Sequence, residues 1–126
     1  KEIENNSADI FYRHNMSKIH MSFDKIVDKI FESIDSIQDN MINLSNEKLK
    51  NNTHEVDSYD DFKKLIESQS GFVIAGWDGT EETEEAIKNE TKATIRCIPE
   101  NLDSKGVTCI YSGKPAAHKV IFSKSY

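Results

Sequence analysis

Apolar residues recur every three or four positions between residues 23 and 44, with charged and amide side chains between them. The recurring residues are Phe23, Ile26, Val27, Ile30, Phe31, Ile34, Ile37, Met41 and Leu44. This spacing predicts one long amphipathic helix, with Ser22 as its N-cap. The apolar stripe is too wide for the residues before it to cover, so we expect the helix to pack on another part of a larger protein as well.

Short β-type runs at residues 10–13 and 19–21 precede this helix, and Asn15 and Ser17 between them suit a turn. Two strands alone make a weak sheet, so they predict further strands elsewhere. Residues 43–57 are rich in asparagine and charge. We interpret them as a fraying helix end that passes into a linker, with a domain boundary near residue 55.

The second half predicts a small α+β domain. Ser58 would cap a helix over 59–68, and the glycine-bounded apolar run 72–77 is typical of a central strand covered on both faces. Thr80 would cap a helix whose first turns are acidic. Three β runs follow at 93–98, 108–111 and 119–123. The expected fold is a small mixed sheet flanked by helices.

Composition excludes several classes of protein. The 126 residues carry 22 acidic and 16 basic side chains, a net charge of −6, so the cationic surface of a non-specific nucleic-acid binder is missing. The two cysteines are too few for a secreted disulfide scaffold, which favours the cytoplasm. Charges interrupt the segment 23–49 and argue against a membrane role. The beginning, Lys1-Glu2-Ile3, reads as a loop, and we expect a fragment of a longer protein.

Four motifs stand out in the second half of the chain: Gly76-Trp77-Asp78-Gly79-Thr80, Glu90-Thr91-Lys92-Ala93-Thr94-Ile95-Arg96-Cys97-Ile98-Pro99, Gly113-Lys114-Pro115 and the ending Phe122-Ser123-Lys124-Ser125-Tyr126. In their order and spacing they resemble the C-terminal domain of the eukaryotic- and archaeal-type prolyl-tRNA synthetases, a form also found in some bacteria. Upstream, Phe11-Tyr12-Arg13-His14 and the long helix are similar to the end of that enzyme's anticodon-binding domain. The resemblance implies a division into 1–54, the end of the anticodon-binding domain with its linker, and 55–126, the zinc-binding-like C-terminal domain.

This resemblance implies a class II ligase that activates proline with ATP and Mg²⁺ and attaches it to tRNA(Pro) as a homodimer. The catalytic residues are not in this chain, since Arg96 alone cannot replace the arginines that clamp ATP phosphates. The chain would support its own catalytic domain and the anticodon-binding domain. The alternative is a free-standing binding module that uses the same domain. A nucleophile at Cys97 or Cys109 with His118 lacks a third, orienting group.

Many relatives carry a zinc site built from two cysteine pairs, and its four positions fall here on Asp78, Thr83, Cys109 and Ser112. One thiol, one carboxylate and two hydroxyls are poor zinc ligands, so we predict no zinc. We expect Asp78, Thr83 and Ser112 to form a hydrogen-bond cluster that ties two loops together instead. Cys97 is expected to be a small buried apolar residue.

In the family the terminal tyrosine and carboxylate lie near the active site, so the resemblance implies a supporting role for Tyr126; a frayed end is the alternative. His118, Lys114, Lys119 and Lys124 make the end of the chain basic. A strand edge protected by lysines is favoured there over a phosphate contact. The remaining histidines show neither ligand spacing nor carboxylate companions; they are His14, His20 and His54.

Overall fold

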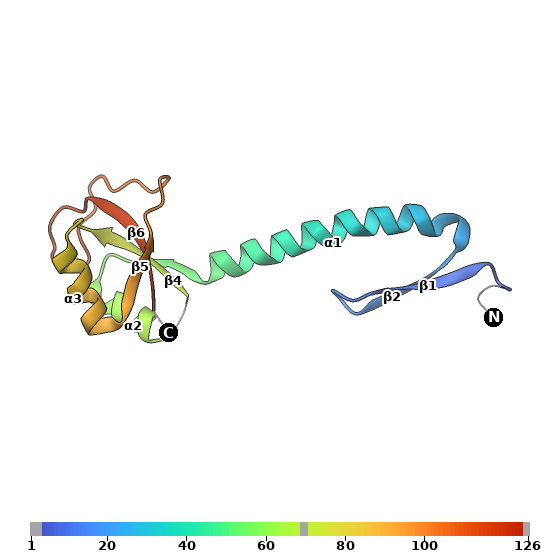
Figure 1. Ribbon diagram of the computed structural model, residues 1–126, viewed down its shortest axis with the longest axis horizontal. Coiled ribbons are helices and arrows are strands. Elements are labelled where there is room, and N and C mark those ends of the chain that lie inside the picture. Colours follow the sequence, from blue (N-terminus) through green and yellow to red (C-terminus); the bar gives the residue numbers. More distant parts are fainter. Residues whose placement is uncertain (1–3, 69–70, 125–126) are drawn as a thin grey trace. The chain divides into compact units, whose positions relative to one another are not determined.

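A computed structural model describes residues 4–68 and 71–124 of the chain. These residues form two compact units, Lys1–Glu47 and Lys48–Tyr126. The fold is α+β, with two small sheets, one long helix and shorter helices (Figure 1). The predicted fold class is therefore confirmed. Among the described residues, no helix is both long enough and apolar enough to cross a membrane.

The first unit consists of a β-hairpin and most of the long helix. Strands β1 (Ser7–Tyr12) and β2 (Ser17–Ser22) pair antiparallel, with Tyr12 opposite Ser17, as the two predicted β runs suggested. Helix α1 runs from Phe23 to Asn51. The hydroxyl groups of Tyr12 and Ser33 lie 2.7 Å apart and join the hairpin to the helix. Ser33 is the one buried residue of α1, so little of this helix is covered.

The expected linker at 43–57 is wrong in two respects. The helix continues without a break to Asn51, and residues Thr53–Glu55 form strand β3. Lys48 and Lys50 in the last turn suit the negative end of a helix, and the Thr53 hydroxyl donates to the carbonyl of Leu49 at 2.7 Å. The asparagines and charges of this stretch therefore mark an exposed helix surface, which composition alone does not separate from a linker.

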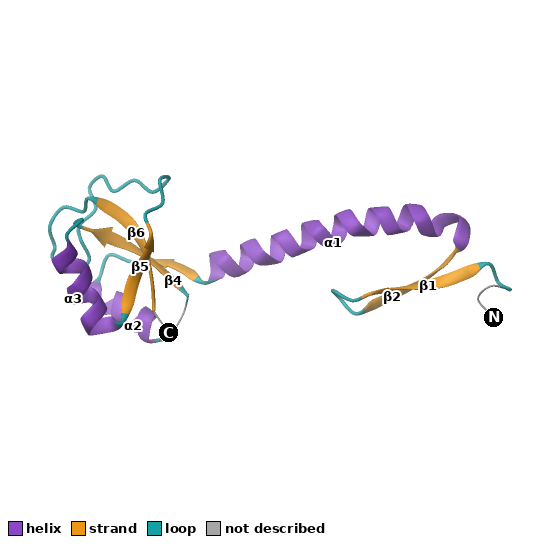
Figure 2. Ribbon diagram, viewed as in Figure 1, coloured by secondary structure: helices purple, strands orange, loops and turns teal. Residues whose placement is uncertain are grey.

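The second unit is a four-stranded sheet with two helices. The strands are β3, β4 (Phe72–Trp77), β5 (Ala93–Cys97) and β6 (His118–Lys124), in the spatial order β3-β4-β6-β5. β3 and β4 are parallel, whereas β6 is antiparallel to both of its neighbours. Helices α2 (Tyr59–Glu67) and α3 (Glu81–Thr91) pack on each other and on β4 and β5, respectively (Figure 2).

A single hydrophobic core lies between these helices and the sheet. Phe62 and Phe122 are fully buried and meet edge to face, with ring centroids 5.1 Å apart. Other core residues are Ile66, Val73, Ala75, Ile87, Ala93, Ile110 and Val120. As predicted, β4 is a central strand, but it is not covered on both faces, because Phe72 at its start is 37% exposed.

The predicted strand at 108–111 is wrong. Thr108 and Pro115 form an isolated antiparallel bridge, and the residues between them form turns. The β-type residues at 109 and 110 are buried because this loop lies against β4, where the amide of Ile110 donates to the carbonyl of Gly76 at 2.9 Å. A Cβ on Gly76 would lie 2.2 Å from the Thr108 carbonyl oxygen. Only glycine therefore lets this loop approach the strand so closely.

Candidate functional site

The carboxylate of Asp78 accepts hydrogen bonds from the start of helix α3 and from the loop at 108–115. Its Oδ1 accepts from the amide and the hydroxyl of Thr80, at 3.2 and 2.9 Å. Its Oδ2 accepts from the hydroxyls of Thr83 at 3.0 Å and of Ser112 at 2.6 Å. We call these four residues the Asp78 clasp. The clasp joins the start of α3 to the loop at 108–115.

Hydrogen bonding makes Asp78 an unusually strong acid. Burial alone would raise the pKa of this carboxyl group, but the hydrogen bonds from Ser112, Thr80 and Thr83 favour the ionised form, and the pKa falls to about 2. The carboxylate is therefore charged at neutral pH, and each of its oxygens accepts two hydrogen bonds. Because both carboxylate oxygens are occupied by these hydrogen bonds, the role of Asp78 in this site is to hold the surrounding chain in place.

The local sequence explains why the clasp forms. Gly79, with φ of +83°, turns the chain after β4. Thr80 then adopts extended backbone angles as the N-cap of α3, and its side chain accepts from the amide of Thr83. The predicted role of Thr80 as a helix cap is confirmed. The Trp77 indole donates to the carbonyl of Thr80 at 3.1 Å and adds a further constraint.

The four positions that the resemblance assigned to zinc ligands hold side chains that are engaged in other ways. Asp78, Thr83 and Ser112 meet through hydrogen bonds, whereas Cys109 is buried, with 2% exposure, in the same loop as Ser112. Among the described residues, no group of three or more His, Cys, Asp or Glu side chains could hold a metal ion. The hydroxyl donors and the fully used carboxylate do not fit zinc.

A second carboxylate, Glu90, was missed by sequence reasoning. Its two oxygens accept from the hydroxyls of Tyr59 and Tyr111, each at 2.9 Å. The two tyrosine rings meet edge to face, with centroids 5.2 Å apart. Desolvation and the hydrogen bond to Glu90 raise the pKa of Tyr59, and the bond to Glu90 raises that of Tyr111. We call these three residues the Glu90 clasp. It connects α2, α3 and the loop at 108–115.

Two expectations about residues of strands β5 and β6 are wrong. Cys97 is exposed, because it ends the outer strand β5 at a register shift that begins after Ile95. Strand β6, which carries His118 and Lys119, is not a sheet edge but lies between β4 and β5. Its Lys119 makes an ion pair with Glu55 of β3. This lysine therefore bridges strands and does not protect an edge.

His20 has a carboxylate companion, contrary to expectation. Its Nδ1 lies 2.6 Å from Asp9 Oδ1, because the hairpin register places these two residues opposite each other. Lys18 lies 2.5 Å from the other oxygen of Asp9. The pair could have been found from the sequence only with the correct register of the hairpin.

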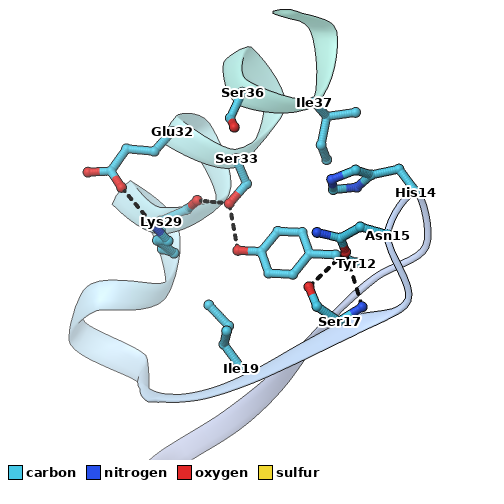
Figure 3. A pocket seen from close by; sticks show the side chains of 10 residues that line it. All are labelled: Tyr12, His14, Asn15, Ser17, Ile19, Lys29, Glu32, Ser33, Ser36 and Ile37. Atoms are coloured by element: carbon cyan, nitrogen blue, oxygen red, sulfur yellow. Dashed lines mark hydrogen bonds and ion pairs between the residues drawn. The ribbon is translucent and has the colours of Figure 1, made fainter. Parts of the chain in front are cut away.

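A small cavity of about 250 Å³ lies between the hairpin and α1 (Figure 3). Figure 3 shows that several of its polar side chains interact with one another. Lys29 pairs with Glu32 at 3.0 Å, and Asn15 Oδ1 accepts from the amide and the hydroxyl of Ser17. Neither these contacts nor the lining residues provide a catalytic arrangement, so the Asp78 clasp is the main candidate site.

Comparison with known proteins identifies the family. The family described as "Prolyl-tRNA synthetase, C-terminal" matches residues 59–126. A proline–tRNA ligase of Porphyromonas gingivalis is 43% identical over 126 residues, which are 100% of this chain and 25% of that protein. The ligase of Amoebophilus asiaticus is 40% identical over 125 residues, with 99% of this chain and 26% of that protein covered. The chain thus spans about a quarter of the length of these curated relatives, and it belongs to the prolyl-tRNA synthetase C-terminal family.

Proposed function

We propose that this chain is the C-terminal part of a proline–tRNA ligase of the eukaryotic and archaeal type. The complete ligase would activate proline with ATP and Mg²⁺ and attach it to tRNA(Pro), as a cytoplasmic homodimer. One observation carries the proposal: relatives named proline–tRNA ligase match the whole chain, yet only about a quarter of their own length. The catalytic centre then lies in the remaining part of the ligase.

In this proposal the described residues have a structural role. Residues 55–126 form a supporting domain whose loop at 108–115 is fixed by the two clasps without a metal ion. Residues 1–54 include the end of the anticodon-binding domain, and the last two of them, Thr53 and His54, also begin strand β3 of the second unit. The polar groups of the two clasps support this structural role, since their hydrogen bonds hold loops and helices together.

Tyr126 has a proposed supporting role at the active site of the complete ligase. It lies outside the described residues, but the chain is held in place up to Lys124. The carbonyl of Lys124 accepts from the Arg96 guanidinium at 3.0 Å, and the Ser123 hydroxyl donates to the carbonyl of Gly71 at 3.1 Å. The last residues therefore start from a fixed point, as a positioned carboxylate requires.

The test uses the complete ligase. We expect proline-dependent exchange of pyrophosphate into ATP and charging of tRNA(Pro), with alanine as the control amino acid. Failure to activate proline would refute the proposal. Deletion of Tyr126 should lower the rate of prolylation, whereas a Lys105→Ala change in an exposed loop should not. An unchanged rate after the deletion would remove the role of Tyr126 and leave the rest of the proposal in place.

A further inference from the structure

Helix α1 exposes a continuous apolar surface that nothing among the described residues covers. Its hairpin side is occupied: Ser33 is buried, and Ile26 and Ile37 are half-buried. Next to that side lies what we call the open stripe. Its members are Phe23, Val27, Ile30, Phe31, Ile34 and Met41, with exposures between 38% and 66%. Exposed apolar surface of this extent marks an interaction site.

An acidic ridge borders the open stripe. Asp24 and Asp28 lie seven and three residues before Phe31, and Asp35 lies four residues after it. These spacings place the three aspartates on one side of the helix with Phe31. Asp39 continues the ridge one turn further. All four are exposed, and no ion pair joins Asp28, Asp35 or Asp39 to any described residue. A surface that covers the stripe therefore meets a row of negative charges at one border.

We infer that the open stripe and its acidic ridge dock onto the part of the proline–tRNA ligase outside this chain, on an apolar surface bordered by lysine or arginine side chains. The inference rests on the proposed function. About three-quarters of each relative's length lies outside the matched region, so a large partner surface belongs to the same polypeptide. Basic side chains at its border complement the four aspartates.

A second copy of the chain fits this surface less well. Alternating spacings of four and three residues, as in a coiled-coil seam, separate Phe23, Val27, Ile30 and Ile34. In a coiled coil, however, the flanking positions carry complementary charges. Here one flank holds Phe31 and Asp24, whereas the other holds Ser33, which is bonded to Tyr12 of the hairpin. The apolar surface is thus wider than a seam on one side and occupied on the other, as expected of a helix on a globular body.

Thiol labelling of the complete ligase tests the inference. Ile34→Cys lies in the open stripe, and Asn43→Cys lies on the opposite, exposed side of α1 as a matched control. Both are made in a Cys97→Ser background, because Cys97 is exposed and Cys109 is buried. Mass spectrometry of the digested protein reads the label at each position. In the isolated chain we expect similar labelling at both positions, and in the complete ligase at least tenfold slower labelling at Ile34→Cys alone.

The partner's charge is tested in the same assay. Asp28→Lys with Asp35→Lys should speed labelling at Ile34→Cys in the complete ligase several-fold, whereas Glu47→Lys, away from the ridge, should leave it unchanged. Equal labelling of Ile34→Cys and Asn43→Cys in the complete ligase would overturn the inference. Protection that already appears in the isolated chain and grows with its concentration would also overturn it, in favour of a second copy. Proline charging, measured in parallel, shows separately whether the proposed function stands.

Discussion

Removing the Asp78 carboxylate should destabilise the second unit by about 2 kcal/mol. The pKa of Asp78 falls from the ordinary value of 3.8 to about 2, and a tenfold change in an equilibrium constant corresponds to about 1.4 kcal/mol. This gives a ceiling of roughly 2.5 kcal/mol, which solvent screening of a partly exposed carboxylate reduces. Asp78→Ala also removes the acceptor of the hydroxyl of Thr83, a residue that is 7% exposed, and such a loss costs about 1–3 kcal/mol.

The assay is urea unfolding followed by tryptophan fluorescence. Trp77 is the single tryptophan of the chain and lies next to Asp78, so its emission reports on the second unit. Asp78→Asn removes the charge at nearly constant size. Asp103→Asn is the matched control, because Asp103 is an exposed loop residue that accepts one backbone amide, from Lys105 at 2.9 Å. We expect the control to change the free energy of unfolding by less than about 0.5 kcal/mol.

The pH dependence gives the sharper test. A folded-state pKa below the unfolded value means that the stabilisation is fully present above about pH 4 and is lost as the pH falls through about 2. The stability difference between the wild-type chain and Asp78→Asn should therefore shrink between these pH values. A difference that is absent at pH 7, or that persists unchanged at pH 2, would refute the assignment of the clasp to the ionised carboxylate.

Three further predictions concern the same unit. Glu90→Gln should lower the urea midpoint by less than Asp78→Ala, because the amide keeps one acceptor for the tyrosine hydroxyls, and an unchanged midpoint would contradict the Glu90 clasp. Gly76→Ala should cost about 1–3 kcal/mol in the same unfolding assay, since its Cβ would clash with the Thr108 carbonyl. Metal analysis of the purified chain should find no stoichiometric zinc, and one zinc per chain would contradict our view of the four aligned positions.

Local sequence patterns were sufficient where the determinants of structure are themselves local. The spacing of apolar residues predicted α1, and Thr80 before an acidic first turn predicted the cap of α3. The end of α1 was placed too early, because asparagine-rich helix surfaces resemble linkers in composition. The run at 108–111 was taken for a strand, because its buried residues have the same composition whether they pair in a sheet or pack against one.

Local sequence patterns did not predict the contacts between residues that are far apart in the sequence. The meeting of Asp78 with Ser112 was expected only through the resemblance, which assigned both positions to one cluster. Nothing comparable pointed to Glu90, whose two tyrosine partners lie 21 and 31 residues away in the sequence. Neither spacing corresponds to a helix or hairpin period, so only the packing of α2 and α3 on the sheet brings these side chains together.

Hydrogen bonds suffice to hold the loop at 108–115 because its backbone is already constrained. The amides of Cys109 and Gly113 bond to the carbonyls of Lys114 and Cys109 at 2.7 and 3.0 Å, and the amide of Ile110 bonds to β4. The two clasps then fix the loop through the adjacent side chains of residues 111 and 112. Because each clasp contributes only part of the total restraint, losing one should loosen the loop without unfolding a domain whose overall stability is typically 5–15 kcal/mol. A zinc site concentrates the same restraint in one ion, whereas here it is distributed over independent contacts.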